Sequence, residues 1–88
     1  MYEIIFRNPA KRFLKKLDKH VQKEIIAKIE KLKENPRIGV PLVKNLSGLW
    51  RLRHGIYRII YQIKEFELIV YIIDIGHRSN IYNKKYDL

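Results

Sequence analysis

Three arginines stand close together in the segment RLRHGIYRIIY, at positions 51, 53 and 58. A guanidinium group keeps its charge at physiological pH and presents a planar fork of donors that fits the oxygens of a phosphate. Like charges that face one another across a sheet cost a few tenths of a kcal/mol to about 1 kcal/mol per pair. A bound anion would offset that cost, so Arg51, Arg53 and Arg58 indicate a phosphate-binding surface.

A second polar motif, GHRSNIY, follows the last apolar segment. Arg78 supplies a cation, His77 an imidazole and Tyr82 a phenol within six residues of one another. Phosphodiester chemistry uses such groups to stabilise charge and to move protons. Each also has an ordinary structural explanation, since a histidine at a strand end commonly lies on the surface and a tyrosine in a tail commonly packs.

The first three arginines need two antiparallel strands to bring them together. The segment alternates with period two, and a two-residue turn at His54-Gly55 would place Arg51 opposite Arg58. All three arginines then share one face. The other face carries the aromatic and apolar residues Trp50, Leu52, Tyr57, Ile59 and Tyr61. Two alternatives stay open: a longer turn would slip the register by one residue and send Arg58 to the opposite face, or the arginines simply cover a solvated surface.

The strands and helices of the rest of the chain form a simple order. Residues 2–7 are β-branched and aromatic and predict a strand, after which Asn8 can cap a helix that has Pro9 at its first position. Apolar residues recur at helical spacing in this first helix, at Ala10, Phe13, Leu14 and Leu17. Basic residues fill its other side, so the helix is amphipathic.

A second helix is predicted from Asp18, as N-cap, to Asn35-Pro36. Its apolar face carries Val21, Ile25, Ile29 and Leu32, and acidic and basic neighbours give it an ordinary solvated outer face. Residues 35–48 contain two prolines and two glycines without a clear period, which predicts a long loop.

Three strands are expected after the loop, at Leu49–Arg53, Ile56–Ile63 and Leu68–Ile75, with Gly76 breaking the last one. The last strand is apolar on both faces, which is typical of a central strand. The order predicts an α+β fold, β-α-α-β-β-β, with a helical hairpin packed on one face of a mainly antiparallel sheet. A length of 88 residues predicts a single domain over residues 1–88.

Composition restricts the partners and the chemistry. Nineteen Lys and Arg against nine Asp and Glu give a formal net charge of +10, which attracts nucleic acid, an acidic protein or an anionic membrane surface, unless it only aids solubility. The absence of cysteine excludes disulfides and thiol catalysis, and with three scattered histidines we expect no metal and no cofactor. The longest apolar run, Leu68–Ile73, is far shorter than the roughly 20 residues of a membrane span, and the first residues lack a signal-peptide core. We therefore expect a cytoplasmic protein that does not enter a membrane.

Taken in order, the motifs ENPR, LSGLWRLRHGIYRIIYQI and VYIIDIGHRSNIY make nearly the whole chain resemble the RelE/ParE superfamily of toxins from prokaryotic type II toxin–antitoxin systems. The hairpin and the end of the last strand are most similar to the RelE branch. The resemblance implies a RelE-like fold and a ribosome-dependent endonuclease that cuts mRNA in the A site, with the 2′-hydroxyl as nucleophile on the adjacent phosphate.

The resemblance also implies roles for individual residues. By position in the motifs, Arg51, Arg58, Arg78 and Tyr82 correspond to catalytic residues, and Arg53 to a residue that grips the substrate. The best-known RelE pattern has lysines on the strand that carries Arg51 and Arg53, whereas a guanidinium is a poor proton donor. We therefore expect these two arginines to act as electrostatic clamps and Tyr82 to act as the base, because nearby cations favour a phenolate. His77, which also borders the substrate, is the second acid–base candidate.

The same resemblance implies partners and competing functions. We expect a RelB-like acidic antitoxin, the ribosome and its mRNA, with the lysines of both helices contacting rRNA. Within the superfamily, a ParE-like inhibitor of DNA gyrase is an alternative. A non-catalytic module that binds RNA or the ribosome is a second alternative, from a different functional class.

Overall fold

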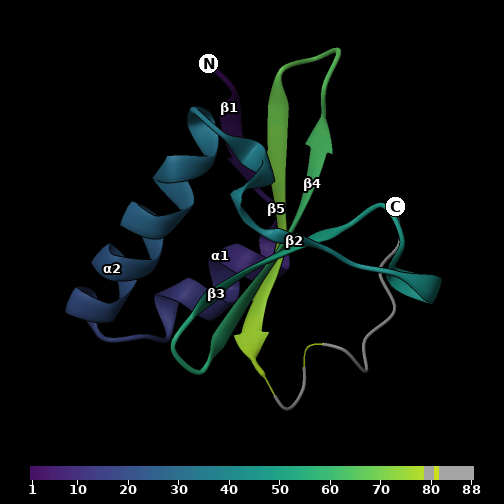
Figure 1. The fold of residues 1–88 in the computed structure, drawn as a ribbon. Coiled ribbons are helices and arrows are strands. Elements are labelled where there is room, and N and C mark those ends of the chain that lie inside the picture. Colours follow the sequence, from purple (N-terminus) through teal and green to yellow (C-terminus); the bar gives the residue numbers. More distant parts are fainter. Residues whose placement is uncertain (79–80, 82–88) are drawn as a thin grey trace.

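A single mixed sheet with two helices on one face forms the fold (Figure 1). The computed structural model describes residues 1–78 and 81. Within them, five strands have the order β1-β5-β4-β3-β2; β1 pairs with β5 in parallel, and the other pairs are antiparallel. The elements are β1 (Glu3–Phe6), α1 (Asn8–Lys15), α2 (Lys19–Glu30), β2 (Val40–Pro41), β3 (Trp50–His54), β4 (Tyr57–Lys64) and β5 (Ile69–His77). The predicted α+β class is confirmed.

The local sequence explains where each of the two helices begins. Arg7, with extended backbone, is the N-cap of α1, one residue before the predicted cap, and Pro9 lies in the first turn, where its missing N–H costs nothing. Asp18 is the N-cap of α2, as predicted. The α-helix ends at Glu30, earlier than predicted, because the chain tightens into a 3₁₀ turn, η1 (Lys31–Lys33), before Pro36.

The main core lies between the helices and the sheet. The helices contribute Ala10, Leu14, Ile25 and Ile29, η1 contributes Leu32, and the sheet contributes Leu52, Ile59, Tyr61, Val70, Ile72 and Ile75. All of these side chains are buried. This burial of apolar surface holds α1 and α2 against β3, β4 and β5. No helix in the described part of the chain is long and apolar enough to cross a membrane.

One buried tyrosine orders the first part of the segment that was predicted as a loop. The Tyr61 hydroxyl donates to Pro36 O at 2.6 Å and accepts from Gly39 N at 3.2 Å, and burial raises the pKa of Tyr61 to about 12. A Cβ at Gly39 would lie 2.5 Å from both the Tyr61 hydroxyl and Arg51 O, so only glycine fits. These contacts fix a 3₁₀ turn, η2 (Pro36–Ile38), and place β2 at the edge of the sheet.

A second, smaller cluster covers part of the other face of the sheet. It contains Leu49, Ile60 and Ile81, packed against Leu42, Leu46 and Ile73. The segment between β2 and β3, which includes the 3₁₀ turn η3 (Lys44–Leu46), lies over this face in Figure 1. The predicted central position of the last strand is confirmed, since β5 lies between β1 and β4.

Gly76 does not break the last strand, contrary to the prediction. β5 continues through it to His77, and Gly76 pairs with Arg58 of β4. A Cβ at Gly76 would meet Ile81 Cδ1 at 3.0 Å. The glycine therefore leaves room for Ile81 to pack on the sheet.

The turn between β3 and β4 also differs from the prediction. His54 pairs with Tyr57, so the turn residues are Gly55 and Ile56, and Gly55 has a φ of 59°. A glycine with positive φ at the first turn position is the pattern of a type II′ hairpin. Arg53, not Arg51, therefore lies opposite Arg58. The register differs by two residues, and a shift of two leaves every side chain on its predicted face.

Candidate functional site

The arginine face, which we define as Arg51, Arg53 and Arg58, lies on the side of the sheet away from the helices. Arg53 and Arg58 are direct cross-strand partners, and Arg51 lies two residues from Arg53, opposite Ile60. Arg53 is exposed, Arg51 is half-buried and Arg58 is buried. The alternation of the strands thus brings all three arginines together, although their chemical role stays a prediction.

Arg58 is held in place by the hairpin that carries it. Its Nη1 donates to Gly55 O at 2.9 Å and to Tyr57 O at 3.1 Å. Only 7% of the residue is exposed. A guanidinium has five N–H donors, so the group can hold the turn and still present donors to an anion. The result is a fixed positive charge at the turn end of β4.

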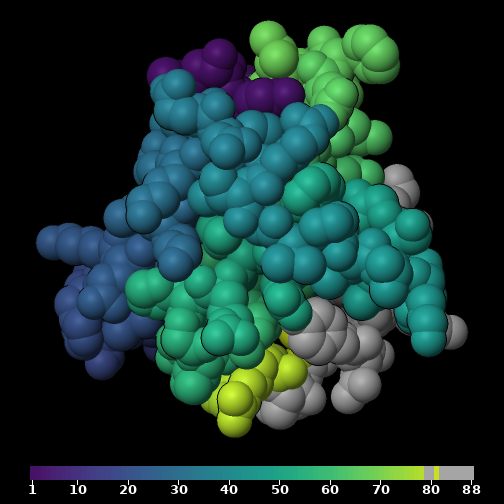
Figure 2. All heavy atoms as spheres, in the orientation of Figure 1, coloured from purple at the N-terminus to yellow at the C-terminus, as the bar shows by residue number. Residues whose placement is uncertain are grey.

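Arg78 is hydrogen-bonded to the same turn through its backbone. Its backbone N–H donates to Ile56 O at 3.0 Å, directly after β5 ends, and the residue is exposed. In Figure 2 the end of β5 (yellow) borders the β3–β4 hairpin (green) at the surface. The structure therefore brings Arg78 to the end of the sheet that carries Arg53 and Arg58.

His77 is not brought to the arginine face. It pairs with Tyr57, and the two ring centroids lie 6.2 Å apart at 80°. Tyr57 also contacts Phe13 of α1, with centroids 5.8 Å apart, so His77 lies on the side that carries the helices. Its predicted role near the substrate stays a prediction, and Tyr82 lies outside the described residues.

Sequence reasoning missed a buried acid next to these cations. Asp74 is 2% exposed and pairs with Ile60, which places it on the same side of the sheet as Arg51. Its Oδ1 accepts from Ile75 N at 2.9 Å. An aspartate inside the apolar run VYIIDIG was the available signal, because a buried carboxylate needs hydrogen bonds or ion pairs. Among the described residues, no group of three His, Asp or Glu side chains could hold a metal ion.

Comparison with known proteins agrees with this fold. Residues 4–82 match the model of the family described as the ParE toxin of the type II toxin–antitoxin system parDE, and the chain belongs to this RelE/ParE toxin family. The match covers nearly all of the described residues. The predicted membership is therefore confirmed.

Named relatives extend the comparison. Toxin RelG of Mycobacterium tuberculosis is 32% identical over 85 residues, which cover 94% of this chain and 98% of RelG. The mRNA interferase toxin RelE of Escherichia coli is 26% identical over 87 residues, with coverage of 94% and 92%. The toxin–antitoxin complex RelBE2 of Mycobacterium tuberculosis contains a chain with a TM-score of 0.80 and 31% identity, with coverage of 90% of this chain and 93% of that one.

Proposed function

We propose that this toxin is a ribosome-dependent endoribonuclease that cuts mRNA in the A site by attack of a 2′-oxygen on the adjacent phosphate. The observation that carries the proposal is the direct pairing of Arg53 with Arg58, with Arg51 on the same face. Such a pair is unfavourable without an anion, and forked donors suit a phosphate. The name of a relative, an mRNA interferase, supports the same chemistry.

Each arginine has a distinct task in this reaction. Arg58 and Arg51 hold the phosphate and neutralise the charge that develops on it during in-line attack. Arg78, tethered to Ile56, stabilises the departing 5′-oxygen. Arg53, which is exposed, grips the neighbouring part of the substrate. All four act through fixed charge, since a guanidinium does not exchange protons at neutral pH.

Proton transfer needs a different residue. We assign the base to Tyr82, which lies outside the described residues and follows Ile81 in the sequence. Ile81 is buried with Ile60 on the arginine side of the sheet. His77 is the weaker candidate, because it lies on the opposite side of the sheet from Arg58. Because the described residues offer no close pair of proton-transfer groups on the arginine face, cleavage depends on the ribosome to align the nucleophile.

Two kinds of partner follow from this function. The ribosome and its mRNA bind the strongly basic surface, a salt-sensitive interaction that does not depend on sequence. A RelB-like antitoxin restrains the toxin in the cell; the similar chain of Mycobacterium tuberculosis was crystallised as a toxin–antitoxin complex. An acidic antitoxin would complement the net charge of +10.

Primer extension on mRNA in translating ribosomes tests the proposal. We expect cuts confined to A-site codons with the wild-type protein. Arg58→Ala should lower the cleavage rate at saturating ribosomes by at least about a hundredfold, as the removal of a transition-state donor does. Arg12→Ala removes the same charge from the exposed surface of α1 and should cleave at nearly the wild-type rate. Equal rates for the two variants would refute the role of Arg58.

The same samples distinguish the two alternatives. The matching family model is described as a ParE toxin, which favours a gyrase inhibitor as the second candidate. Inhibition of DNA supercoiling by gyrase, together with intact mRNA on ribosomes, would establish that function. A non-catalytic ribosome-binding module would instead produce no cuts, and Arg58→Ala would only weaken its ribosome binding.

A further inference from the structure

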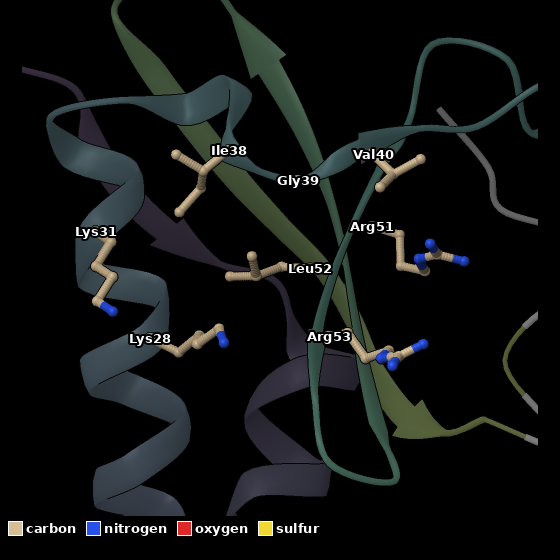
Figure 3. Close-up of a pocket in the computed structure, with 8 residues that line it drawn as sticks. All are labelled: Lys28, Lys31, Ile38, Gly39, Val40, Arg51, Leu52 and Arg53. Carbon is tan, nitrogen blue, oxygen red and sulfur yellow. The ribbon is translucent and has the colours of Figure 1, made fainter.

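A groove separates α2 from the outer edge of β3, on the side of β3 away from the arginine side chains (Figure 3). Its volume is about 430 Å³. The lining residues come from α2, η1, η2, β2 and β3, with Gly39 between η2 and β2: Lys28, Lys31, Ile38, Gly39, Val40, Arg51, Leu52 and Arg53. We call it the lysine groove. None of its lining residues is acidic, and Lys28 and Lys31 make the groove positive.

The two lysines of the groove have no carboxylate partner in the part of the chain that the structure describes. Each of the nearby acids of α2 is engaged elsewhere: Glu24 Oε1 lies 3.3 Å from His54 Nε2, and Glu30 Oε2 lies 2.7 Å from Lys33 Nζ. Within residues 1–78 and 81, neither Lys28 nor Lys31 forms an ion pair. Like charges three residues apart on a helical turn repel each other. An anion between them would convert that repulsion into attraction.

The edge of β3 adds a backbone donor to the groove. Leu42 N donates to Leu49 O at 2.9 Å, and Val40 pairs with Arg51, so the odd-numbered residues of β3 turn their backbone groups toward β2. This pairing ends at Val40. Among the described residues, no strand lies opposite Arg53 on this edge, and its N–H faces the groove.

The size of the opening favours a phosphate over a peptide strand. β2 covers Trp50 and Arg51 of the β3 edge, and the contact between Glu24 and His54 closes the other end. Only residues 52–54 remain uncovered, which is too short for an added strand to form a ladder. Two ammonium groups and one amide donor instead match the oxygens of a single phosphate group.

We propose that the lysine groove binds a second phosphate of the RNA strand whose reacting phosphate lies on the arginine face. This inference rests on the proposed function. Arg51 and Arg53 line the groove with their backbone, whereas their side chains point away from α2 to the other side of β3 (Figure 3). The edge of β3 is therefore the boundary between the two sites, and one strand that bends over it contacts both.

Binding of uncleavable RNA tests the groove without any measurement of cleavage. The probes are a fluorescent 2′-O-methyl hexanucleotide and the matching dinucleotide, which has a single internucleotide phosphate. The variant is Lys28→Gln with Lys31→Gln. The matched control is Lys19→Gln with Lys23→Gln, which removes the same charge from exposed positions of α2 outside the groove.

We expect the groove variant to bind the hexanucleotide about fivefold more weakly at low salt, the effect of two exposed charge pairs. Its slope of log affinity against log salt should decrease by about 0.7 for each phosphate that the variant no longer neutralises. The dinucleotide should bind the groove variant and the wild type alike. The control should change hexanucleotide affinity by less than about twofold, since its lysines lie away from the groove.

The amide resonance of Arg53 gives a second readout. In the wild type it should shift further on addition of the hexanucleotide than of the dinucleotide, because only the hexanucleotide reaches the groove. In the groove variant the two probes should shift it to the same extent. Equally weakened binding in the two double variants, or unchanged binding in both, would overturn the proposal. The proposal would also be overturned, in favour of an acidic protein partner, if a poly-glutamate peptide shifts the Arg53 amide resonance and the hexanucleotide does not. Because cleavage enters neither readout, failure of the nuclease proposal remains distinguishable from failure of this one.

Discussion

Replacement of Tyr61 by phenylalanine removes the hydroxyl that fixes the segment from Pro36 to Gly39. The hydroxyl donates to Pro36 O at 2.6 Å and accepts from Gly39 N at 3.2 Å, and the side chain is fully buried. Loss of a buried hydrogen-bonding group whose partners remain costs about 1–3 kcal/mol of unfolding free energy. We expect Tyr61→Phe to be less stable than the wild type by this amount near neutral pH.

The same tyrosine makes stability depend on pH in the alkaline range. Burial raises the pKa of Tyr61 from 10.0 in the unfolded chain to about 12 in the fold. The folded state therefore holds this proton more tightly than the unfolded state. The protonated Tyr61 therefore contributes its full share of the unfolding free energy below pH 10, and this share is lost as the pH rises through 12. Two pKa units correspond to about 2.7 kcal/mol. The unfolding free energy of Tyr61→Phe should lack this pH-dependent contribution.

Urea unfolding at pH 7 to 11 measures both effects. Trp50 is the single tryptophan and stacks on Tyr61, with ring centroids 6.2 Å apart, so its fluorescence reports directly on this part of the fold. Other groups titrate in the same range, so the informative quantity is the difference between wild type and variant. That difference should shrink as the pH rises. The control, Tyr71→Phe, removes a hydroxyl without a hydrogen-bond partner among the described residues. If the unfolding free energies of the wild type and of Tyr61→Phe change in parallel with pH, the raised pKa assigned to Tyr61 is refuted.

Two further substitutions test the packing that supports the site. Gly39→Ala places a Cβ 2.5 Å from Arg51 O and should destabilise the protein by about 1–3 kcal/mol, measured as a lower urea midpoint with an unchanged m-value; a midpoint equal to the wild type would show that the segment can move aside. Ile29→Ala leaves a cavity in the core between the helices and the sheet and should cost about 2–5 kcal/mol in the same assay. A destabilisation below about 1 kcal/mol would mean that α2 is less important to the core than its burial indicates.

Local patterns predict the face of each side chain better than its partner. Alternation with period two places Arg51, Arg53 and Arg58 together whatever the turn, provided that the register shifts by an even number. The choice between a turn at His54-Gly55 and one at Gly55-Ile56 depends on backbone geometry, because both pairs contain the same glycine. The observed turn uses the positive φ of Gly55 at its first position.

Features that depend on distant residues could not be predicted from the sequence. The segment 35–48 resembled a loop because the order of its first part comes from Tyr61, which lies 25 residues from Pro36. The lysine groove depends on where β2 ends and on the contact between Glu24 and His54, 30 residues apart. His77 stands next to Arg78 in the sequence, but the continuation of β5 through Gly76 places its ring against Tyr57.

The bonds from Arg58 to the hairpin turn have a consequence for affinity. The carbonyl oxygens of Gly55 and Tyr57 already occupy Nη1, so an incoming anion binds the donors on Nη2 and Nε. The two bonds fix the side chain before any ligand arrives, so little side-chain entropy is lost on binding. The hairpin thereby preorganises this cation for its ligand.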